Sequence, residues 1–150
     1  GRAKFVPADY THAAELPDQA FPCVLITGRQ LEHWHTGSMT RHATVLDALE
    51  PEPIVNIHPQ DLRSRGIKAG DFVHLRSRRG EITARARADR GLQVGSVFMA
   101  FCYVEAAANL LTVEELDPFG KIPEFKYCAV DIAKVPAEKG NLRALQAQNN

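Results

Sequence analysis

The sequence predicts a mainly β protein, a closed barrel of about six short strands with short helices at its periphery. Apolar runs, or alternation of apolar and polar residues with a period of two, occur at six places along the chain. The segments between them carry proline and glycine turn residues and only short helical patterns. Closure would also remove the exposed edge strands of an open sheet. With 150 residues, 45% of them hydrophobic, the chain can bury one core without disulfides or metals.

The first expected strand is a continuous apolar run that follows Pro22 and stops at Gly28, as is typical of a buried strand. The third strand alternates, with Phe72, His74 and Arg76 on the side opposite to Val73 and Leu75. The six expected strands are, in chain order, Cys23–Thr27, Ile54–Ile57, Phe72–Arg76, Glu81–Ala88, Val97–Phe101 and Ala129–Lys134.

A hairpin is expected where the turn Ser77–Gly80 joins the third and fourth strands. One side of the fourth strand carries Ile82, Ala84, Ala86 and Ala88, and the other carries Thr83, Arg85, Arg87 and Asp89. An arginine cluster falls within the same fifteen residues: Arg76, Arg78, Arg79, Arg85, Arg87 and Arg90. Because this cluster coincides with the polar side and the turn, we expect it to be mostly a solvent-facing surface. The formal net charge of zero also argues against a nucleic-acid or membrane-surface binder.

Short helices are expected between the strands. His58–Gly66 has proline near its first turn and glycine at its end, which is the usual polarity of helix punctuation. The alanine-rich stretch Glu105–Leu111 predicts a second helix, and Met39–Leu49 a third. We expect residues 1–20 to form an N-terminal extension or linker, residues 21–136 the barrel domain, and residues 137–150 a polar C-terminal tail.

Cys23, Cys102 and Cys128 are far apart and form no C-x-x-C pair, which indicates reduced thiols and hence a cytoplasmic setting or a complex that tolerates free cysteines. The same spacing argues against a structural zinc or iron–sulfur site in this chain, because both need clustered ligands. The sequence has no apolar run of membrane-spanning length and no signal-peptide pattern at its start.

The segment ITGRQLEHWHTGSMTR, residues 26–41, is too polar for a core and has three candidate uses: a metal site, a phosphate site or a plain structural loop. A metal site built on His33, His35 and His42 is disfavoured, because Glu32 is the only acidic residue close by. Serine nucleophile chemistry is disfavoured as well, because Ser38 is not in a G-x-S-x-G pattern. Phosphate or nucleotide binding suits the residues better, since glycine permits close backbone approach and arginine offers a planar fork of donors. A helix starting near Met39 would direct its positive end at the anion. A plain polar loop remains the alternative.

Four segments of the sequence carry a resemblance to a known family over roughly residues 21–135. They are LITGRQLEHWHTGSMTR, NIHPQDLRSRGIKAGDFVHLRSRRGEITARA, GSVFMAFCYVEAAANLLT and DPFGKIPEFKYCAV. They resemble the C-terminal molybdopterin-dinucleotide-binding domain of the molybdenum/tungsten bis-(molybdopterin guanine dinucleotide) oxidoreductases. That family includes formate dehydrogenases and prokaryotic nitrate reductases. The resemblance implies a six-stranded double-psi β-barrel, in agreement with the strand count above. EAAANLLT and KIPEFKYCAV look most like formate dehydrogenases, whereas LEHWHTGSMTR is shared with nitrate reductases.

The resemblance also implies cofactor-binding residues. The loop at the end of the first strand would wrap the pyrophosphate of the dinucleotide and the edge of the pterin, and three distant side chains would complete the site. Without the resemblance, Phe101 would be interpreted as core, Asn109 as a helix cap and Lys126 as a surface lysine. The implied binding residues are Thr27, Gly28, Arg29, Gln30, Leu31, Glu32, His33, Trp34, His35, Thr36, Thr40, Phe101, Asn109 and Lys126.

The implied function is cofactor binding in a formate dehydrogenase that oxidises formate to carbon dioxide. The alternatives are the same domain of a nitrate reductase, or a stand-alone double-psi barrel that acts as an interaction module. The resemblance places the metal ligand and any iron–sulfur cluster in preceding domains, so we expect no catalytic or metal-binding residue in this chain and no activity from it alone. Its expected partners are those domains and electron-transfer subunits, with no nucleic acid or membrane contact. A cytoplasmic location is expected, or a periplasmic one if the parent protein carries a twin-arginine signal.

Overall fold

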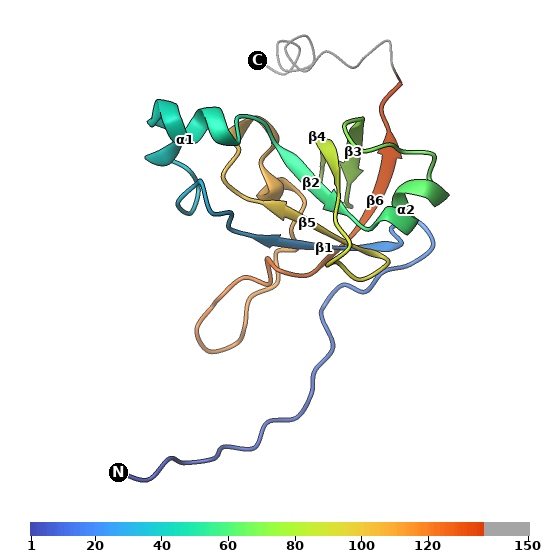
Figure 1. Ribbon diagram of the computed structural model, residues 1–150. Helices are drawn as coiled ribbons and strands as arrows, with labels where there is room; N and C mark the ends of the chain where they lie inside the picture. Colours follow the sequence, from blue (N-terminus) through green and yellow to red (C-terminus); the bar gives the residue numbers. More distant parts are fainter. Residues whose placement is uncertain (137–150) are drawn as a thin grey trace.

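The computed structural model describes residues 1–136, and the expected tail at 137–150 lies outside the described residues. Its sheet closes into a barrel, from which an N-terminal segment and the loop before the last strand project (Figure 1). All six expected strands are present within a few residues of their expected bounds. They are β1 (Cys23–Gly28), β2 (Ile54–Ile57), β3 (Phe72–Arg76), β4 (Glu81–Ala88), β5 (Ser96–Ala100) and β6 (Cys128–Lys134).

The strand order around the barrel is β1-β5-β2-β4-β3-β6, and β6 pairs with β1 to close it. The pairs β1–β5 and β2–β4 are parallel, whereas the other four are antiparallel. Parallel neighbours cannot be joined by a tight turn, so each parallel pair is linked by a long crossing connection. The expected double-psi barrel, mainly β with short helices around it, is confirmed.

Alternate strand residues point into the barrel and form its core, as the period-two patterns predict. In β4 the buried residues are Ile82, Ala84 and Ala86. Ala88, expected on the same side, is exposed because it is the last residue of the strand. The largest core side chains from the strands are Leu25, Val55, Ile57, Val73, Leu75, Val97, Met99 and Val130.

The expected helix at His58–Gly66 is confirmed as α2 (Pro59–Ser64), which His58 caps by accepting a hydrogen bond from the amide of Gln60. The predictions of a single helix at each of the other two places are wrong. Met39–Leu49 divides into the 3-10 turn η1 (Thr40–His42) and α1 (Thr44–Leu49), because Ala43 between them is extended. Glu105–Leu111 forms two 3-10 turns, η2 (Val104–Ala106) and η3 (Ala108–Leu110), separated by an extended Ala107.

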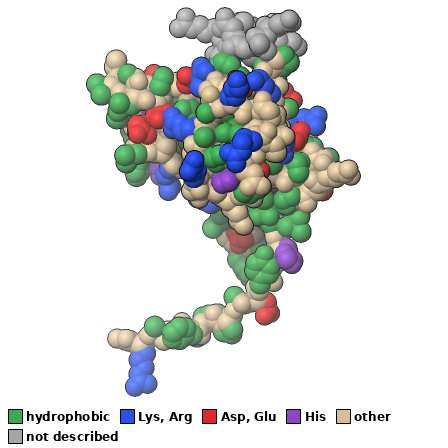
Figure 2. Space-filling view, turned by 45° about the vertical axis from the view of Figure 1, so that its right-hand side comes forward, with side chains coloured by type: hydrophobic (Ala, Val, Ile, Leu, Met, Phe, Trp, Pro, Cys, Tyr) green, Lys and Arg blue, Asp and Glu red, His purple; other side chains and the backbone are tan. Residues whose placement is uncertain are grey.

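Among residues 1–136, five of the six arginines of the expected cluster pair with carboxylates, and Arg90 is the exception. Arg76 approaches Asp131, Arg85 pairs with Glu52, and Arg87 with Glu50. Figure 2 shows basic side chains over one face of the barrel with acidic side chains among them. This surface is therefore a set of solvent-facing ion pairs, as the strand pattern predicts.

All three cysteines are buried and free. Burial raises the pKa of the Cys102 thiol and of the Cys128 thiol to about 11 each, so both stay protonated near neutral pH. Within residues 1–136, no helix is both long enough and apolar enough to cross a membrane.

Part of the expected N-terminal extension contacts the barrel. The carboxylate of Glu15 binds both terminal nitrogens of Arg79 at 2.6 and 2.9 Å and accepts the amide of Ala129 at 2.7 Å. Asp18 pairs with Arg78, whose guanidinium lies over the Phe21 ring. These contacts join the N-terminal segment to the β3–β4 turn and to β6.

Replacing Glu15 with glutamine is expected to flatten the acid dependence of stability. Hydrogen bonding to Arg79 lowers the pKa of Glu15 from 4.5 to about 2. A carboxyl whose pKa is lower in the folded state stabilises the fold above its unfolded pKa, and that stabilisation is lost as the pH falls from about 4.5 toward 2. We expect the free energy of unfolding of the wild type to exceed that of Glu15→Gln by about 1–3 kcal/mol at pH 7 and by much less near pH 2.

Urea denaturation at a series of pH values measures this difference. Glu114→Gln, a matched change at an exposed glutamate, is the control and should follow the wild type. A constant gap between wild type and Glu15→Gln from pH 7 to pH 2 would contradict the ion-pair account.

Candidate functional site

Three segments that are far apart in sequence meet where β1 ends. The hydroxyl of Thr27, which is buried, donates to the Phe125 carbonyl at 2.5 Å. The amide of Phe101, just after β5, donates to the Gly28 carbonyl at 3.1 Å. A Cβ at Gly28 would lie 2.6 Å from Cε2 of Phe98, so the chain approaches the neighbouring strand more closely than a side chain allows. The glycine turn, Phe101 and the segment carrying Lys126 therefore lie next to one another.

The loop after Gly28 is held by its own backbone and by short side chains. A terminal nitrogen of Arg29 lies 3.2 Å from Nε2 of His35, a residue with a positive φ of 50°. The amide of Trp34 donates to the Thr40 hydroxyl at 3.0 Å, and the amide of Gly37 to the Trp34 carbonyl at 2.9 Å. These contacts within the protein hold the turn in place without a ligand.

The histidines of this loop have separate environments. His33 is 1% exposed, and its Nε2 donates to the Glu50 carbonyl at 2.9 Å, while its Nδ1 has no hydrogen-bond partner among residues 1–136. His35 is half-buried beside Arg29, and His42 is exposed on η1. No group of three or more histidine, cysteine, aspartate or glutamate side chains in the described part of the chain is arranged to hold a metal ion.

The remaining implied residues differ in their exposure. Leu31 and Trp34 are 95% and 62% exposed, and Thr36 is exposed as well, so these side chains face outward. Gln30 and Glu32 are half-buried and line a small cavity of about 60 Å³.

Phe101 packs against the barrel core, Lys126 is exposed, and Asn109 is exposed on η3. No hydrogen bond within residues 1–136 links Asn109 to the loop. The backbone of its neighbour Leu110 instead passes close to Gly80 of the β3–β4 turn. The expected anion-directed helix is absent here, because η1 is a single 3-10 turn and α1 begins only at Thr44.

The charges around the loop are distributed unevenly. Arg41 pairs with Asp47 and Glu105, and Arg87 pairs with Glu50. Arg29 and Lys126, in contrast, have no carboxylate partner within the part of the chain that the structure describes. Neither of these two cations, which flank the Thr27–Phe125 hydrogen bond in sequence, forms an ion pair within residues 1–136.

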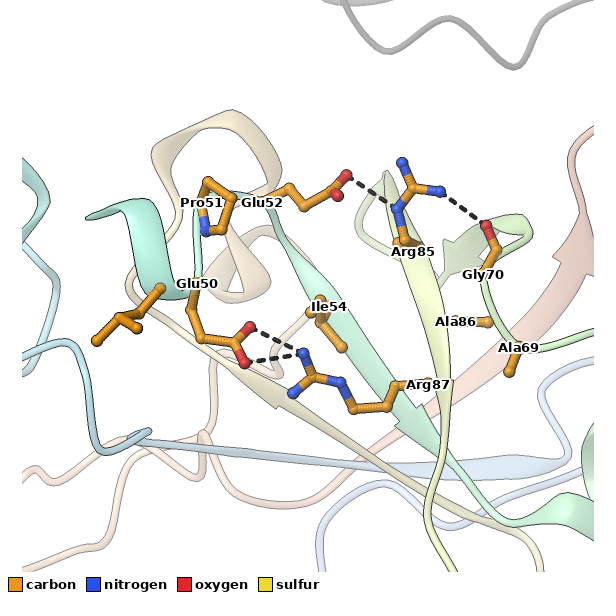
Figure 3. Close-up of a pocket in the computed structure, with 10 residues that line it drawn as sticks. Glu50, Pro51, Glu52, Ile54, Ala69, Gly70, Arg85, Ala86 and Arg87 are labelled. Atoms are coloured by element: carbon orange, nitrogen blue, oxygen red, sulfur yellow. Dashed lines mark hydrogen bonds and ion pairs between the residues drawn. The ribbon is translucent and has the colours of Figure 1, made fainter. Parts of the chain in front are cut away.

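Residues beneath the loop form a hydrogen-bonded group that no sequence motif marks. The Tyr103 hydroxyl accepts a hydrogen bond from Gln30 Nε2 at 3.0 Å and donates one to the Glu50 carbonyl at 3.1 Å. The carboxylate of Glu50 faces the other way, into a cleft of about 360 Å³, where Arg87 contacts both of its oxygens (Figure 3). The only sequence signal for this arrangement is a tyrosine just after an apolar strand, since a buried tyrosine hydroxyl usually needs a partner.

The strands define a closed six-stranded barrel of the double-psi class, with a glycine turn at the end of β1. A family model described as "Molydopterin dinucleotide binding domain" matches residues 23–129, and the chain belongs to that family. The matched range begins with β1 and ends inside β6, so it covers nearly the whole barrel.

A curated relative agrees with this assignment, and a solved structure has the same fold. The F420-dependent formate dehydrogenase subunit alpha of Methanocaldococcus jannaschii is 48% identical over 135 residues, which cover 90% of this chain and 20% of the relative. The structure of acetylene hydratase from Pelobacter acetylenicus matches with a TM-score of 0.73 and 16% identity, over 84% of this chain and 21% of that one. The latter supports the fold alone. The chain spans about a fifth of the length of each of these proteins.

Proposed function

We propose that this chain is the domain that holds the bis-(molybdopterin guanine dinucleotide) cofactor, with molybdenum or tungsten, in an oxidoreductase of the formate dehydrogenase type. The family match and the 48% identity to a formate dehydrogenase alpha subunit support the proposal. The proposed reaction of the whole protein is the two-electron oxidation of formate to carbon dioxide. When bound, the cofactor and its metal supply that redox chemistry.

One observation carries the proposal. The Thr27–Phe125 hydrogen bond joins two segments whose neighbouring residues, Arg29 and Lys126, are cations without carboxylate partners in residues 1–136. A dinucleotide cofactor carries a pyrophosphate, which needs this kind of compensation, and an arginine fork matches phosphate oxygens in geometry. Arg29 is exposed and forms no ion pair within residues 1–136, whereas Arg41 and Arg79 are paired with carboxylates of this chain, so its guanidinium is available to a phosphate.

The other loop residues fit the same ligand. Gly28 allows the backbone to come close to a phosphate, and the exposed hydroxyl of Thr36 is free to orient toward one. Nδ1 of His33 is a buried acceptor without a partner in the described residues, as a ligand N–H group would require. Asn109 joins this set only through the family resemblance.

The exposed side chains of Leu31 and Trp34 suit coverage by other parts of the protein. Large apolar residues that gather around a binding loop are typical of a buried domain boundary. We propose that preceding domains cover this surface, hold the metal ligand and any iron–sulfur cluster, and pass electrons to further subunits. On this proposal the isolated chain folds, binds the cofactor weakly or not at all and is inactive.

The double substitution Arg29→Ala with Lys126→Ala in the full-length protein tests the proposal. Removing both cations is expected to lower cofactor retention at least roughly tenfold, because a hydrogen bond to a charged group contributes about 1.5–3 kcal/mol. Retention is measured as released guanosine monophosphate and oxidised pterin, with the metal identified by elemental analysis. Arg63→Ala with Lys68→Ala makes the same charge change at exposed positions away from the loop and should leave retention unchanged.

Wild-type cofactor content in the Arg29/Lys126 variant would refute the site, and a wild-type protein without molybdopterin would refute the function. Assays of the loaded wild-type protein with formate and with nitrate then separate the two candidate substrates. Turnover of nitrate but not formate would replace the formate dehydrogenase proposal with the nitrate reductase one.

A further inference from the structure

Tyr103 lies directly beneath the binding loop. It follows β5, is 1% exposed, and makes two hydrogen bonds through one hydroxyl. The donor to it is the side chain of Gln30, the residue next to Arg29 in the loop. Its own proton goes to the backbone carbonyl of Glu50, at the end of α1. A phenolic hydroxyl can serve as acceptor and donor at once, and both capacities are used here.

The ring of Tyr103 is fixed as firmly as its hydroxyl. The guanidinium carbon of Arg41 lies 4.8 Å from the ring centroid, and the His33 ring meets it edge-on at 5.8 Å between centroids. Arg41 is itself held by Asp47 at 2.6 Å and by Glu105 at 2.8 Å. Tyr103 therefore contacts both ends of the loop, Gln30 near its start and Arg41 just past it.

The acceptor of the Tyr103 proton is anchored to the barrel. Both carboxylate oxygens of Glu50 lie 2.9 Å from one terminal nitrogen of Arg87 on β4 (Figure 3). The Glu50 carbonyl also accepts a hydrogen bond from Nε2 of His33. A continuous chain of contacts thus runs from β4 through Glu50 and the Tyr103 hydroxyl to Gln30. Burial raises the pKa of Tyr103, so its hydroxyl keeps the proton that it donates to the Glu50 carbonyl.

We propose that Tyr103 is a positioning residue that sets the shape of the Arg29–Thr36 loop before the dinucleotide binds. The inference rests on the proposed function, because it takes that loop to be the cofactor-binding one. Ordering the loop in advance lowers the entropic cost of binding. Removing the hydroxyl leaves the ring, Arg41 and His33 in place but releases Gln30, and with it the loop position next to Arg29.

The test is a double-mutant cycle of Tyr103→Phe and Gln30→Leu in the full-length protein. In Tyr103→Phe, amide hydrogen exchange of the peptide covering residues 29–36 is expected to speed up roughly threefold to tenfold in cofactor-free protein, the range for one net hydrogen bond. Cofactor retention should fall by a similar factor. In the Gln30→Leu background the same tyrosine change should have less than half of its effect on both readouts, because the partner is already gone. Tyr10→Phe removes a hydroxyl from an exposed tyrosine and should change neither readout.

The outcomes separate the two proposals. Equal loop exchange and cofactor retention in wild type and Tyr103→Phe would overturn the positioning role even if the wild type is fully loaded. Full effects of Tyr103→Phe in the Gln30→Leu background would overturn it as well, since the tyrosine would then act by another route. If no wild-type preparation contains the dinucleotide, the proposed function fails, whereas the exchange data still decide whether Tyr103 orders the loop.

Discussion

Replacing Gly37 with alanine is expected to lower the free energy of unfolding by about 2–4 kcal/mol and to displace the Arg29–Thr36 loop. Gly37 has a φ of +76°, where an L side chain costs about 1–2 kcal/mol. A Cβ there would also lie 2.6 Å from Cγ of Arg41 and 2.8 Å from the Cys102 carbonyl oxygen. The carbonyl belongs to the backbone beside Tyr103, so relief of the clash requires the loop to move.

Gly66 supplies a matched control for this substitution. Its φ of +64° imposes a similar conformational cost on alanine, but no atom lies within 4 Å of the Cβ position. Gly66→Ala should therefore cost only about 1 kcal/mol and leave cofactor retention intact. Urea denaturation compares the two variants. Equal midpoints for Gly37→Ala and Gly66→Ala would show that the loop does not press against Cys102.

Replacing Leu25 with alanine is expected to cost about 2–5 kcal/mol, the usual range for a leucine removed from a core. Leu25 is 0% exposed and lies in β1, where its neighbours across the sheet are Val97 of β5 and Cys128 of β6. A cavity at this point weakens the strand that closes the barrel and ends in the glycine turn. We therefore expect Leu25→Ala to reduce cofactor retention indirectly, through loss of folded protein.

Leu31 gives the complementary control, because it is the same residue type on the outside of the loop. It is 95% exposed, so Leu31→Ala should change the free energy of unfolding by no more than about 0.5 kcal/mol. Denaturant titration of both variants at one pH makes the comparison. If Leu25→Ala lowered the free energy of unfolding no more than Leu31→Ala does, the placement of the Leu25 side chain inside the barrel would be contradicted.

The strands could be predicted from the sequence because their signal is local. Alternating burial in β3 and β4 follows directly from period-two patterns such as that of Phe72–Arg76, and Gly28 marks the end of β1. The helix expected at Glu105–Leu111 failed for a reason that composition does not show. A seven-residue helix is marginal by itself, and packing of Ala106 and Ala108 into the core is achieved by two 3-10 turns around an extended Ala107.

The order of strands around the barrel had no local signal. Pairing of β1 with β5 and of β2 with β4 depends on contacts between distant residues, so only the family resemblance indicated the double-psi arrangement. The site divides in the same way. The glycine turn and its donors form one short segment of sequence, whereas Tyr103 and Glu50 reach Gln30 from far along the chain. Composition makes His33 a candidate metal ligand, yet its Nε2 donates to the Glu50 carbonyl and its ring packs edge-on against Tyr103.

The closure of the barrel by β6 has a kinetic consequence. β1 is the first strand in the chain, and both of its neighbours, β5 (Ser96–Ala100) and β6 (Cys128–Lys134), come late. During synthesis on the ribosome, β1 therefore stays unpaired until nearly the whole domain has emerged. Proteins dominated by such non-local pairings fold slowly, within milliseconds to seconds. During that interval the apolar β1 is the segment most exposed to misassociation.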